Sequence, residues 1–196
     1  MPTISSIATQ MRTAIEQLGS THPLLIAIDG RCGSGKTTLA HALQQQLGCN
    51  VFAMDHFFLR PEQRSPERLS QPGGNVDRER FMAELLPALK QASPVSYRPF
   101  DCQQQTMGEH IHCQPTAISI IEGSYSCHPE LREHYDLRFF ITVNPVEQRQ
   151  RIIERNGEQG ARLFQERWIP LEEAYFSAFD VANACDIRLD TSHAEA

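Results

Sequence analysis

The fold of this chain is indicated most strongly by one stretch, Gly30-Arg31-Cys32-Gly33-Ser34-Gly35-Lys36-Thr37. It is a complete G-x-x-x-x-G-K-[ST] phosphate loop, preceded by the apolar run 24–28 and followed by the helix-forming run 38–47. The glycines let successive backbone N–H groups point at a polyphosphate, and the helix start adds its positive dipole end. Lys36 is expected to reach the β- and γ-phosphates, and Thr37 to ligate Mg²⁺.

Composition narrows the classes of partner. The chain has 196 residues, of which 40% are hydrophobic and 21% charged, as is typical of one α/β domain with a sizeable core. The net charge of −6 and the lack of a basic run argue against a nucleic-acid partner. There is no apolar run of membrane-spanning length and no signal-peptide pattern. Six scattered cysteines favour reduced thiols. We therefore expect a cytoplasmic protein with no membrane partner.

Two acidic residues each follow an apolar run that predicts a buried strand. Asp55 follows 50–54, and Glu122 follows 117–121. Open α/β sheets bind ligands at the carboxyl ends of their strands, so both carboxylates are expected beside the phosphate loop. Asp55 is the candidate catalytic base for a hydroxyl that attacks the γ-phosphate, or else a turn cap. Glu122 stands in a loose Walker B position and is a candidate Mg²⁺ ligand.

The middle of the chain predicts the acceptor side. Residues 60–76 form a long irregular segment, and a helix is expected over 78–90. Asp77 precedes this helix and either caps it or binds substrate. Residues 95–102 and 109–113 predict an antiparallel hairpin. Within it Tyr97 is placed to stack on a planar ring, with Arg98 beside it, although Tyr97 also fits an ordinary strand aromatic.

The C-terminal part predicts a mobile lid. Asn144 and Pro145 begin a helix that carries Arg151 and Arg155 on one face. We expect glycines 157 and 160 to break this helix, and its arginines to clamp phosphate charge or else to form a solvated face. A helix over 171–184 and a strand over 187–189 follow, and residues 191–196 are expected to fray.

Together these runs predict an α/β, three-layer P-loop NTPase fold, in which a five-stranded parallel sheet is flanked by helices and carries a small β-hairpin and a helical lid. We expect one domain over residues 1–196. Its expected parts are a packing helix at 1–20, acceptor-side insertions at 56–77 and 94–115, and the lid at 155–169.

A family resemblance strengthens this prediction. The segments at 29–38, 54–58, 73–77, 97–101 and 120–123, with the helix 145–155, resemble the P-loop small-molecule kinases of the uridine kinase and phosphoribulokinase superfamily. The resemblance implies that Asp55 is the general base on a ribose 5′-hydroxyl. It also implies that Asp77 holds ribose hydroxyls, that Tyr97 lines a nucleobase pocket, and that Arg151 and Arg155 clamp phosphates.

Two segments depart from the uridine kinase pattern. The usual Asp-Ser-Phe-Tyr is Asp-His-Phe-Phe at 55–58, and the segment Arg-Trp-Ile-Pro-Leu at 167–171 also differs. Both are similar to nicotinamide riboside kinases. The acceptor therefore stays open.

The sequence thus predicts an ATP-dependent kinase, with ATP and Mg²⁺ as cofactors, that phosphorylates the 5′-hydroxyl of a nucleoside, with uridine or cytidine favoured. The alternatives are nicotinamide riboside or another small alcohol acceptor, and a non-catalytic nucleotide switch, which the lack of an Asn-Lys-x-Asp motif disfavours. The catalytic candidates are Asp55 and Lys36, and the metal ligands Thr37 and Glu122. The candidate substrate-binding residues are Asp55, Phe57, Asp77, Tyr97 and Arg98. The candidate ATP-binding residues are Gly30, Arg31, Cys32, Gly33, Ser34, Gly35, Lys36, Thr37, Thr38, Arg151 and Arg155.

Two minor questions concern cysteine. A position near a helix N-terminus can lower the pKa of a thiol, but the exposure of Cys32 is not given by the sequence, so its sensitivity to oxidation stays open. A zinc site on Cys102, His110, His112 and Cys113 is a weak alternative to a plain hairpin, because the spacing fits no familiar zinc pattern.

Overall fold

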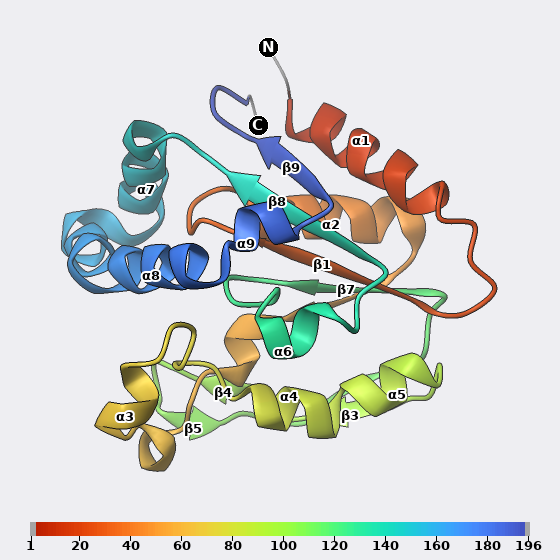
Figure 1. The fold of residues 1–196 in the computed structure, drawn as a ribbon, viewed down its shortest axis with the longest axis horizontal. Helices are drawn as coiled ribbons and strands as arrows, with labels where there is room; N and C mark the ends of the chain where they lie inside the picture. The colour runs from red at the N-terminus through yellow and green to blue at the C-terminus, as the bar shows by residue number, and fades with distance from the viewer. Residues whose placement is uncertain (1–2, 195–196) are drawn as a thin grey trace.

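A computed structural model describes residues 3–194 of the chain. Five parallel strands form one sheet in the order β2-β7-β1-β8-β9 (Figure 1). This confirms the predicted five-stranded parallel sheet. The strands are β1 (Leu24–Gly30), β2 (Asn50–Ala53), β7 (Ile118–Glu122), β8 (Leu137–Thr142) and β9 (Ile187–Asp190).

Alternating side chains of the central strand divide the core into two clusters. Leu24, Ile26 and Ile28 of β1 pack with α1 (Ile4–Glu16) and α2 (Lys36–Leu47) on one face. Leu25 and Ala27 point to the opposite face. Helices cover both faces of the sheet, which confirms the three-layer prediction. The helices that contribute to the second cluster are α4 (Arg78–Glu84), α5 (Leu86–Lys90), α6 (Pro129–Arg132), α8 (Ile169–Phe179) and α9 (Val181–Ala184).

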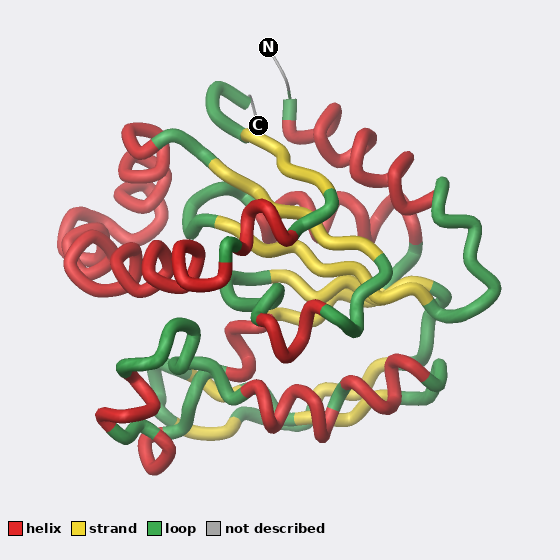
Figure 2. Tube along the Cα trace, in the orientation of Figure 1, coloured by secondary structure: helices red, strands yellow, loops and turns green. Residues whose placement is uncertain are grey.

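The predicted hairpin is present as two short antiparallel ribbons, which lie apart from the main sheet (Figure 2). One pairs β3 (Val95–Tyr97) with β6 (Ile111–Cys113), and the other pairs β4 (Phe100–Asp101) with β5 (Thr106–Met107). Pro99 lies between them and has no N–H to continue a ladder. The irregular segment before α4 contains the short helix α3 (Pro66–Leu69) and the 3-10 turn Pro61–Gln63.

Two predicted helices are divided in the structure. The helix expected over 78–90 is broken at Leu85, and Pro87 lies in the first turn of α5, where a missing N–H costs nothing. The helix expected over 171–184 instead begins at Ile169 and ends at Phe179. Asp180, with a φ of 47°, then separates α8 from α9. Both predictions were wrong in these boundaries.

Helix α7 (Pro145–Leu163) begins as predicted, because the Asn144 side chain accepts a hydrogen bond from the Glu147 N–H. Gly157 breaks the helix as predicted, with φ 70° and ψ 173°. Gly160 does not, because the helix resumes before it. A π-helical turn, Phe164–Trp168, then joins α7 to α8.

The segment after β9 corrects another prediction. Thr191 is fully buried, and the Ser192 hydroxyl accepts a hydrogen bond from the Asn144 N–H. Residues 191–194 are therefore held against the fold rather than frayed, while 195–196 lie outside the described residues. None of the helices within residues 3–194 combines the length and apolar character that a membrane crossing requires.

Candidate active site

The phosphate loop links β1 to α2 and adopts a conformation that suits glycine. Gly33 and Gly35 have φ values of 72° and 88°. Gly30 approaches β8 so closely that a Cβ there would lie 1.9 Å from the Ile141 carbonyl oxygen. Within residues 3–194, the N–H groups of Gly33 and Gly35 donate to no other group of the chain. The loop therefore presents free donors at the start of a helix, which is the geometry of an anion site.

The Lys36 side chain lies across this loop. Its Nζ donates to the Gly30 carbonyl oxygen at 2.7 Å and to that of Arg31 at 2.8 Å. The side chain is nearly buried, with a relative exposure of 8%. A phosphate that binds the ammonium group has to compete with these two carbonyl oxygens.

Thr37 and Glu122 meet beside the loop. The Thr37 hydroxyl lies 3.1 Å and 3.2 Å from the two carboxylate oxygens of Glu122. Burial raises the pKa of Glu122, and the nearby Lys36 charge opposes that shift. Hydroxyl and carboxylate oxygens are the ligands that Mg²⁺ prefers, so this pair fits a Mg²⁺ ion.

Asp55 lies next to the end of β7. It follows β2 in the 3-10 turn Met54–Phe57, and the preceding Ala53 pairs with Glu122 in the sheet. A Cβ on Gly123, whose φ is 130°, would lie 3.6 Å from Asp55 Oδ1. A φ of 130° is strained for a residue that carries a side chain, so glycine suits this junction beside Asp55.

The charges of this group influence one another. The surrounding protein raises the pKa of Asp55, even though its side chain is accessible to solvent, and Lys36 opposes the shift. Asp55 raises the pKa of Glu122, Glu172 raises the pKa of Asp55, and Lys36 lowers the pKa of both Asp55 and Glu122. One cation and two carboxylates thus lie within electrostatic reach at one edge of the sheet.

The predicted acceptor-side aromatics lie in the core. Phe57 is fully buried and stacks on Tyr97, with 5.5 Å between ring centroids. Tyr97 is also buried, and its hydroxyl lies 2.9 Å from Nδ1 of His56. Both rings are covered by neighbouring side chains, so these side chains would have to move before either ring could stack on a planar ligand.

Asp77 and Arg98 each have partners within the chain. The Asp77 carboxylate accepts from the Arg80 N–H at 3.0 Å, which confirms the predicted helix cap, and from Nε2 of Gln63 at 2.7 Å. The Arg98 guanidinium donates to the Gly108 carbonyl oxygen at 2.7 Å and so holds the turn of the second ribbon. Their roles in substrate binding stay predictions.

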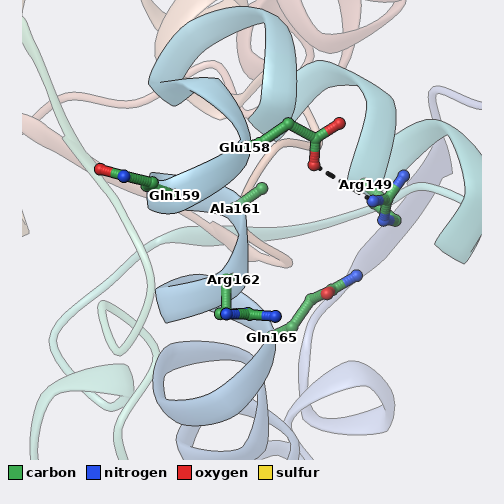
Figure 3. A pocket seen from close by; sticks show the side chains of 6 residues that line it. All are labelled: Arg149, Glu158, Gln159, Ala161, Arg162 and Gln165. Carbon is green, nitrogen blue, oxygen red and sulfur yellow. Dashed lines mark hydrogen bonds and ion pairs between the residues drawn. The ribbon is translucent and has the colours of Figure 1, made fainter.

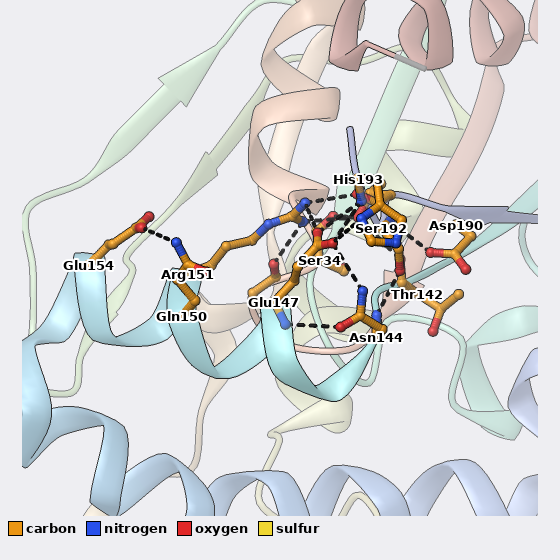
Figure 4. Close-up of polar contacts among 12 residues, drawn as sticks. Ser34, Thr142, Asn144, Glu147, Gln150, Arg151, Glu154, Asp190, Ser192 and His193 are labelled. Atoms are coloured by element: carbon orange, nitrogen blue, oxygen red, sulfur yellow. Dashed lines mark hydrogen bonds and ion pairs between the residues drawn. The ribbon is translucent and has the colours of Figure 1, made fainter. Parts of the chain in front are cut away.

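The two arginines of α7 differ in their surroundings. Arg151 pairs with Glu147 at 3.1 Å, and its guanidinium also donates to the Thr191 carbonyl oxygen at 2.8 Å (Figure 4). Its other nitrogen is 3.4 Å from the Gly33 carbonyl oxygen, so this side chain reaches the loop from outside. Arg155 is exposed and lies close enough to lower the pKa of Asp55.

Two hollows flank the lid region, and neither is lined by the residues predicted to be catalytic. One, of about 310 Å³, lies at the break in α7, where Arg149 pairs with Glu158 at 3.3 Å (Figure 3). The other, of about 330 Å³, lies between the segment before α4 and the start of α8, and includes Asn75 and Arg167.

The surroundings of the cysteines favour neither an activated thiol nor the zinc alternative. Burial raises the pKa of the Cys32 thiol to about 12, and the nearby Glu172 carboxylate adds to the shift. A helix start therefore does not activate this thiol. Among the described residues no cluster of three or more His, Cys, Asp and Glu side chains could hold a metal ion, the candidate zinc ligands included.

Four residues around the loop were not predicted from the sequence. Asp29 is fully buried just before the loop, and its carboxylate accepts from the Cys127 N–H at 2.8 Å. A charged residue inside the apolar run 24–30 was a visible signal for it. The other three, Gln148, Glu172 and Thr191, are also buried, and each bonds a backbone group of the loop. No local pattern marks them.

Comparisons with known proteins place this geometry in context. No family model matches the chain. A uridine kinase of Lactobacillus johnsonii is 26% identical over 152 residues, which cover 73% of this chain and 72% of that protein. A candidate fructose transport system kinase from Silicibacter sp. TM1040 is 25% identical, with a TM-score of 0.63 over 96% of this chain and 100% of that one.

A third relative shares the fold. It is a candidate uridine kinase from Bacillus stearothermophilus, with a TM-score of 0.72 and 20% identity over 93% of this chain and 97% of that one. The phosphate loop, the parallel sheet and these similarities all point to the same class of protein. In sequence and in fold, the chain is similar to the uridine kinase-like P-loop kinases.

Proposed function

We propose that this protein is an ATP-dependent kinase that transfers the γ-phosphoryl group to the 5′-hydroxyl of a nucleoside, with uridine and cytidine as the favoured acceptors. The observation that carries the proposal is the meeting of Lys36, Glu122 and Asp55 at one edge of the sheet, where Lys36 lowers the pKa of both carboxyl groups and Asp55 raises that of Glu122. A donor loop alone would serve any nucleotide-binding protein, whereas a carboxylate beside it supplies a base for an acceptor.

In this mechanism Asp55 orients the acceptor hydroxyl and takes its proton. The hydroxyl oxygen bonds to the γ-phosphorus, and the bond from that phosphorus to the bridging oxygen of ADP breaks. The pKa of Asp55 is raised from its ordinary value, which makes its carboxylate a stronger base for this proton.

The donor side neutralises charge. The loop N–H groups and the Lys36 ammonium hold the phosphates and stabilise the charge that develops during transfer. Thr37 and Glu122 would hold Mg²⁺, which, when bound, neutralises the phosphate oxygens. Arg155 would add positive charge from α7 once a ligand is bound.

A second acceptor class has specific support. His56 replaces the usual serine beside the base and bonds the Tyr97 hydroxyl, and the Trp168–Pro170 segment also departs from uridine kinases. These features favour nicotinamide riboside as the alternative acceptor. The similarity to a candidate fructose transport system kinase keeps other small alcohols within the same test.

ADP release measured with MgATP and single acceptors tests the proposal. The acceptors to compare are uridine, cytidine, nicotinamide riboside, fructose, pantothenate and ribulose 5-phosphate. We expect release to depend on a nucleoside, with uridine or cytidine fastest. Release without any acceptor would indicate a nucleotide hydrolase or switch, and release only with a non-nucleoside would contradict the nucleoside assignment.

Asp55→Asn tests the base on the best acceptor. We expect kcat to fall by about 10²–10⁴-fold, because the amide cannot take the proton. The Kd for MgATP, measured by calorimetry, should stay near the wild-type value, since Asp55 is assigned to the acceptor. A kcat within about tenfold of wild type would show that Asp55 is not the base.

A further inference from the structure

The outer side of the phosphate loop is held by side chains from the last third of the chain. Glu172 accepts from the Cys32 N–H at 3.0 Å, and Gln148 donates to the Cys32 carbonyl oxygen at 2.9 Å. Thr191 donates to the Ser34 carbonyl oxygen at 2.8 Å. These contacts fix the loop backbone from outside and leave the N–H groups of its inner side free.

Glu172 differs from the other two because it bridges two loops. Its second oxygen accepts from the Ser124 hydroxyl at 2.5 Å, and Ser124 follows Glu122 in the loop after β7. One carboxylate on α8 thus joins the loop after β1 to the loop after β7. These are the two loops that carry the donor groups of the proposed site.

The chemistry of this position calls for a carboxylate. Glu172 is 5% exposed, and within residues 3–194 it makes no ion pair. Burying a charge without a counter-ion is costly unless hydrogen bonds satisfy it. Both partners of Glu172 are donors, and only a carboxylate offers two acceptor oxygens to them. A glutamine of the same size would turn an N–H₂ group toward one donor.

We propose that Glu172 is a positioning residue of the donor site, which holds the phosphate loop in register with the loop after β7. This inference rests on the proposed kinase function, because a preorganised loop matters most where phosphate has to be bound in one geometry. Glu172 also lies on the helix that follows the π-helical turn, so it connects the loop to the α7–α8 segment.

Glu172→Gln is the direct test, with MgATP binding measured by calorimetry and amide exchange measured by mass spectrometry. We expect the Kd for MgATP to rise about tenfold or more, as for the loss of a hydrogen bond to a charged group. In the nucleotide-free protein, peptides that cover 30–37 should exchange faster, while those that cover β8 keep their protection.

Two further variants serve as controls for Glu172→Gln. Glu154→Gln makes the same change at an exposed position on α7, where the carboxylate accepts one hydrogen bond within residues 3–194, from Gln150, and this variant should bind MgATP as wild type does. Ser124→Ala removes one partner of Glu172 and should weaken MgATP binding in the same direction but less. The double variant with Glu172→Gln should show less than the sum of the two effects.

The outcomes separate this inference from the proposed function. The inference is overturned if wild type binds MgATP and Glu172→Gln binds within twofold of it, or if exchange rises equally over the whole chain. If Glu172→Gln does not fold, Ser124→Ala decides by the same two measurements. If wild type does not bind MgATP, the kinase proposal fails, while the exchange of peptides 30–37 still decides whether Glu172 holds the loop.

Discussion

The Asp29 carboxylate is a buried charge that the chain surrounds with donors. It accepts from the N–H groups of Gly30, Tyr125 and Cys127 and from the Tyr175 hydroxyl. Burial nevertheless raises its pKa to about 6, because these donors only partly replace water. The protonation of a residue just before the phosphate loop therefore changes around pH 6.

We expect this coupling to appear in the pH dependence of stability. The folded protein keeps the Asp29 proton up to about pH 6, whereas the unfolded chain loses it near pH 3.8. Between these values the folded state binds more protons, so the free energy of unfolding falls as the pH rises. The shift corresponds to about 3 kcal/mol.

Asp29→Asn isolates this contribution, because asparagine does not titrate. Urea unfolding of both proteins at several pH values gives the difference in unfolding free energy, wild type minus variant. That difference should decrease by about 3 kcal/mol from about pH 3 to pH 7. A difference that is constant or increases with pH would contradict the raised pKa.

At the scale of residues, the sequence identified the groups that a local pattern marks. Lys36 and Thr37 belong to a motif, and Asp55 and Glu122 each follow an apolar run. Glu172 has no such mark, because its partners lie far from it in the chain and only the folded structure brings them together. The sequence therefore marks candidates on the inner surface of the proposed site and leaves the supporting residues unmarked.

At the scale of elements, the break in α7 shows what a single glycine fixes. Gly157 has φ 70° and ψ 173°, a region that residues with a Cβ almost never adopt. A Cβ there would meet nothing within 4 Å, so any cost of substitution comes from the backbone alone.

Gly157→Ala should lower the free energy of unfolding by about 1–3 kcal/mol in urea, as expected for a side chain forced into this region. Gln159→Ala is the matched control, because Gln159 is exposed on the same helix and should change stability by less than about 0.5 kcal/mol. Equal stability of the two variants would show that the helix can straighten at no cost.

Elements were predictable where one periodicity runs without interruption. The strands of the main sheet and the helix after the phosphate loop have such patterns, and the structure confirms them. The helix over 78–90 was predicted as one because its apolar spacing continues through Leu85. Pro87 marked the division, and a reading that gave weight to the missing N–H would have found it.

At the scale of the whole molecule, the segment after β9 contacts the phosphate loop, which lies early in the chain. The Thr191 hydroxyl lies 2.8 Å from the Ser34 carbonyl oxygen and 3.1 Å from that of Thr142, and Arg151 donates to it at 3.1 Å. Composition suggested a frayed end here, since the segment is short and polar. Its burial depends on the sheet order, which no local pattern gives.

Thr191→Val keeps the shape of this side chain and removes its hydroxyl. We expect a loss of about 1–3 kcal/mol in unfolding free energy, because buried polar partners are left unsatisfied, and a weaker MgATP affinity. Thr191→Ser keeps the hydroxyl and should lose less than about 1 kcal/mol, the value of one methyl group. Urea unfolding and calorimetry compare the pair, and equal losses would show that the hydroxyl contributes nothing.

The supports of the phosphate loop also set an order of events during synthesis. Synthesis proceeds from the N-terminus, so residues 30–37 leave the ribosome early. The residues that support the loop, Gln148, Glu172 and Thr191, emerge much later. A nascent chain therefore carries the complete nucleotide-binding motif long before it can hold that motif in shape. We therefore expect the proposed site to bind nucleotide tightly only when nearly all of the described chain has left the ribosome.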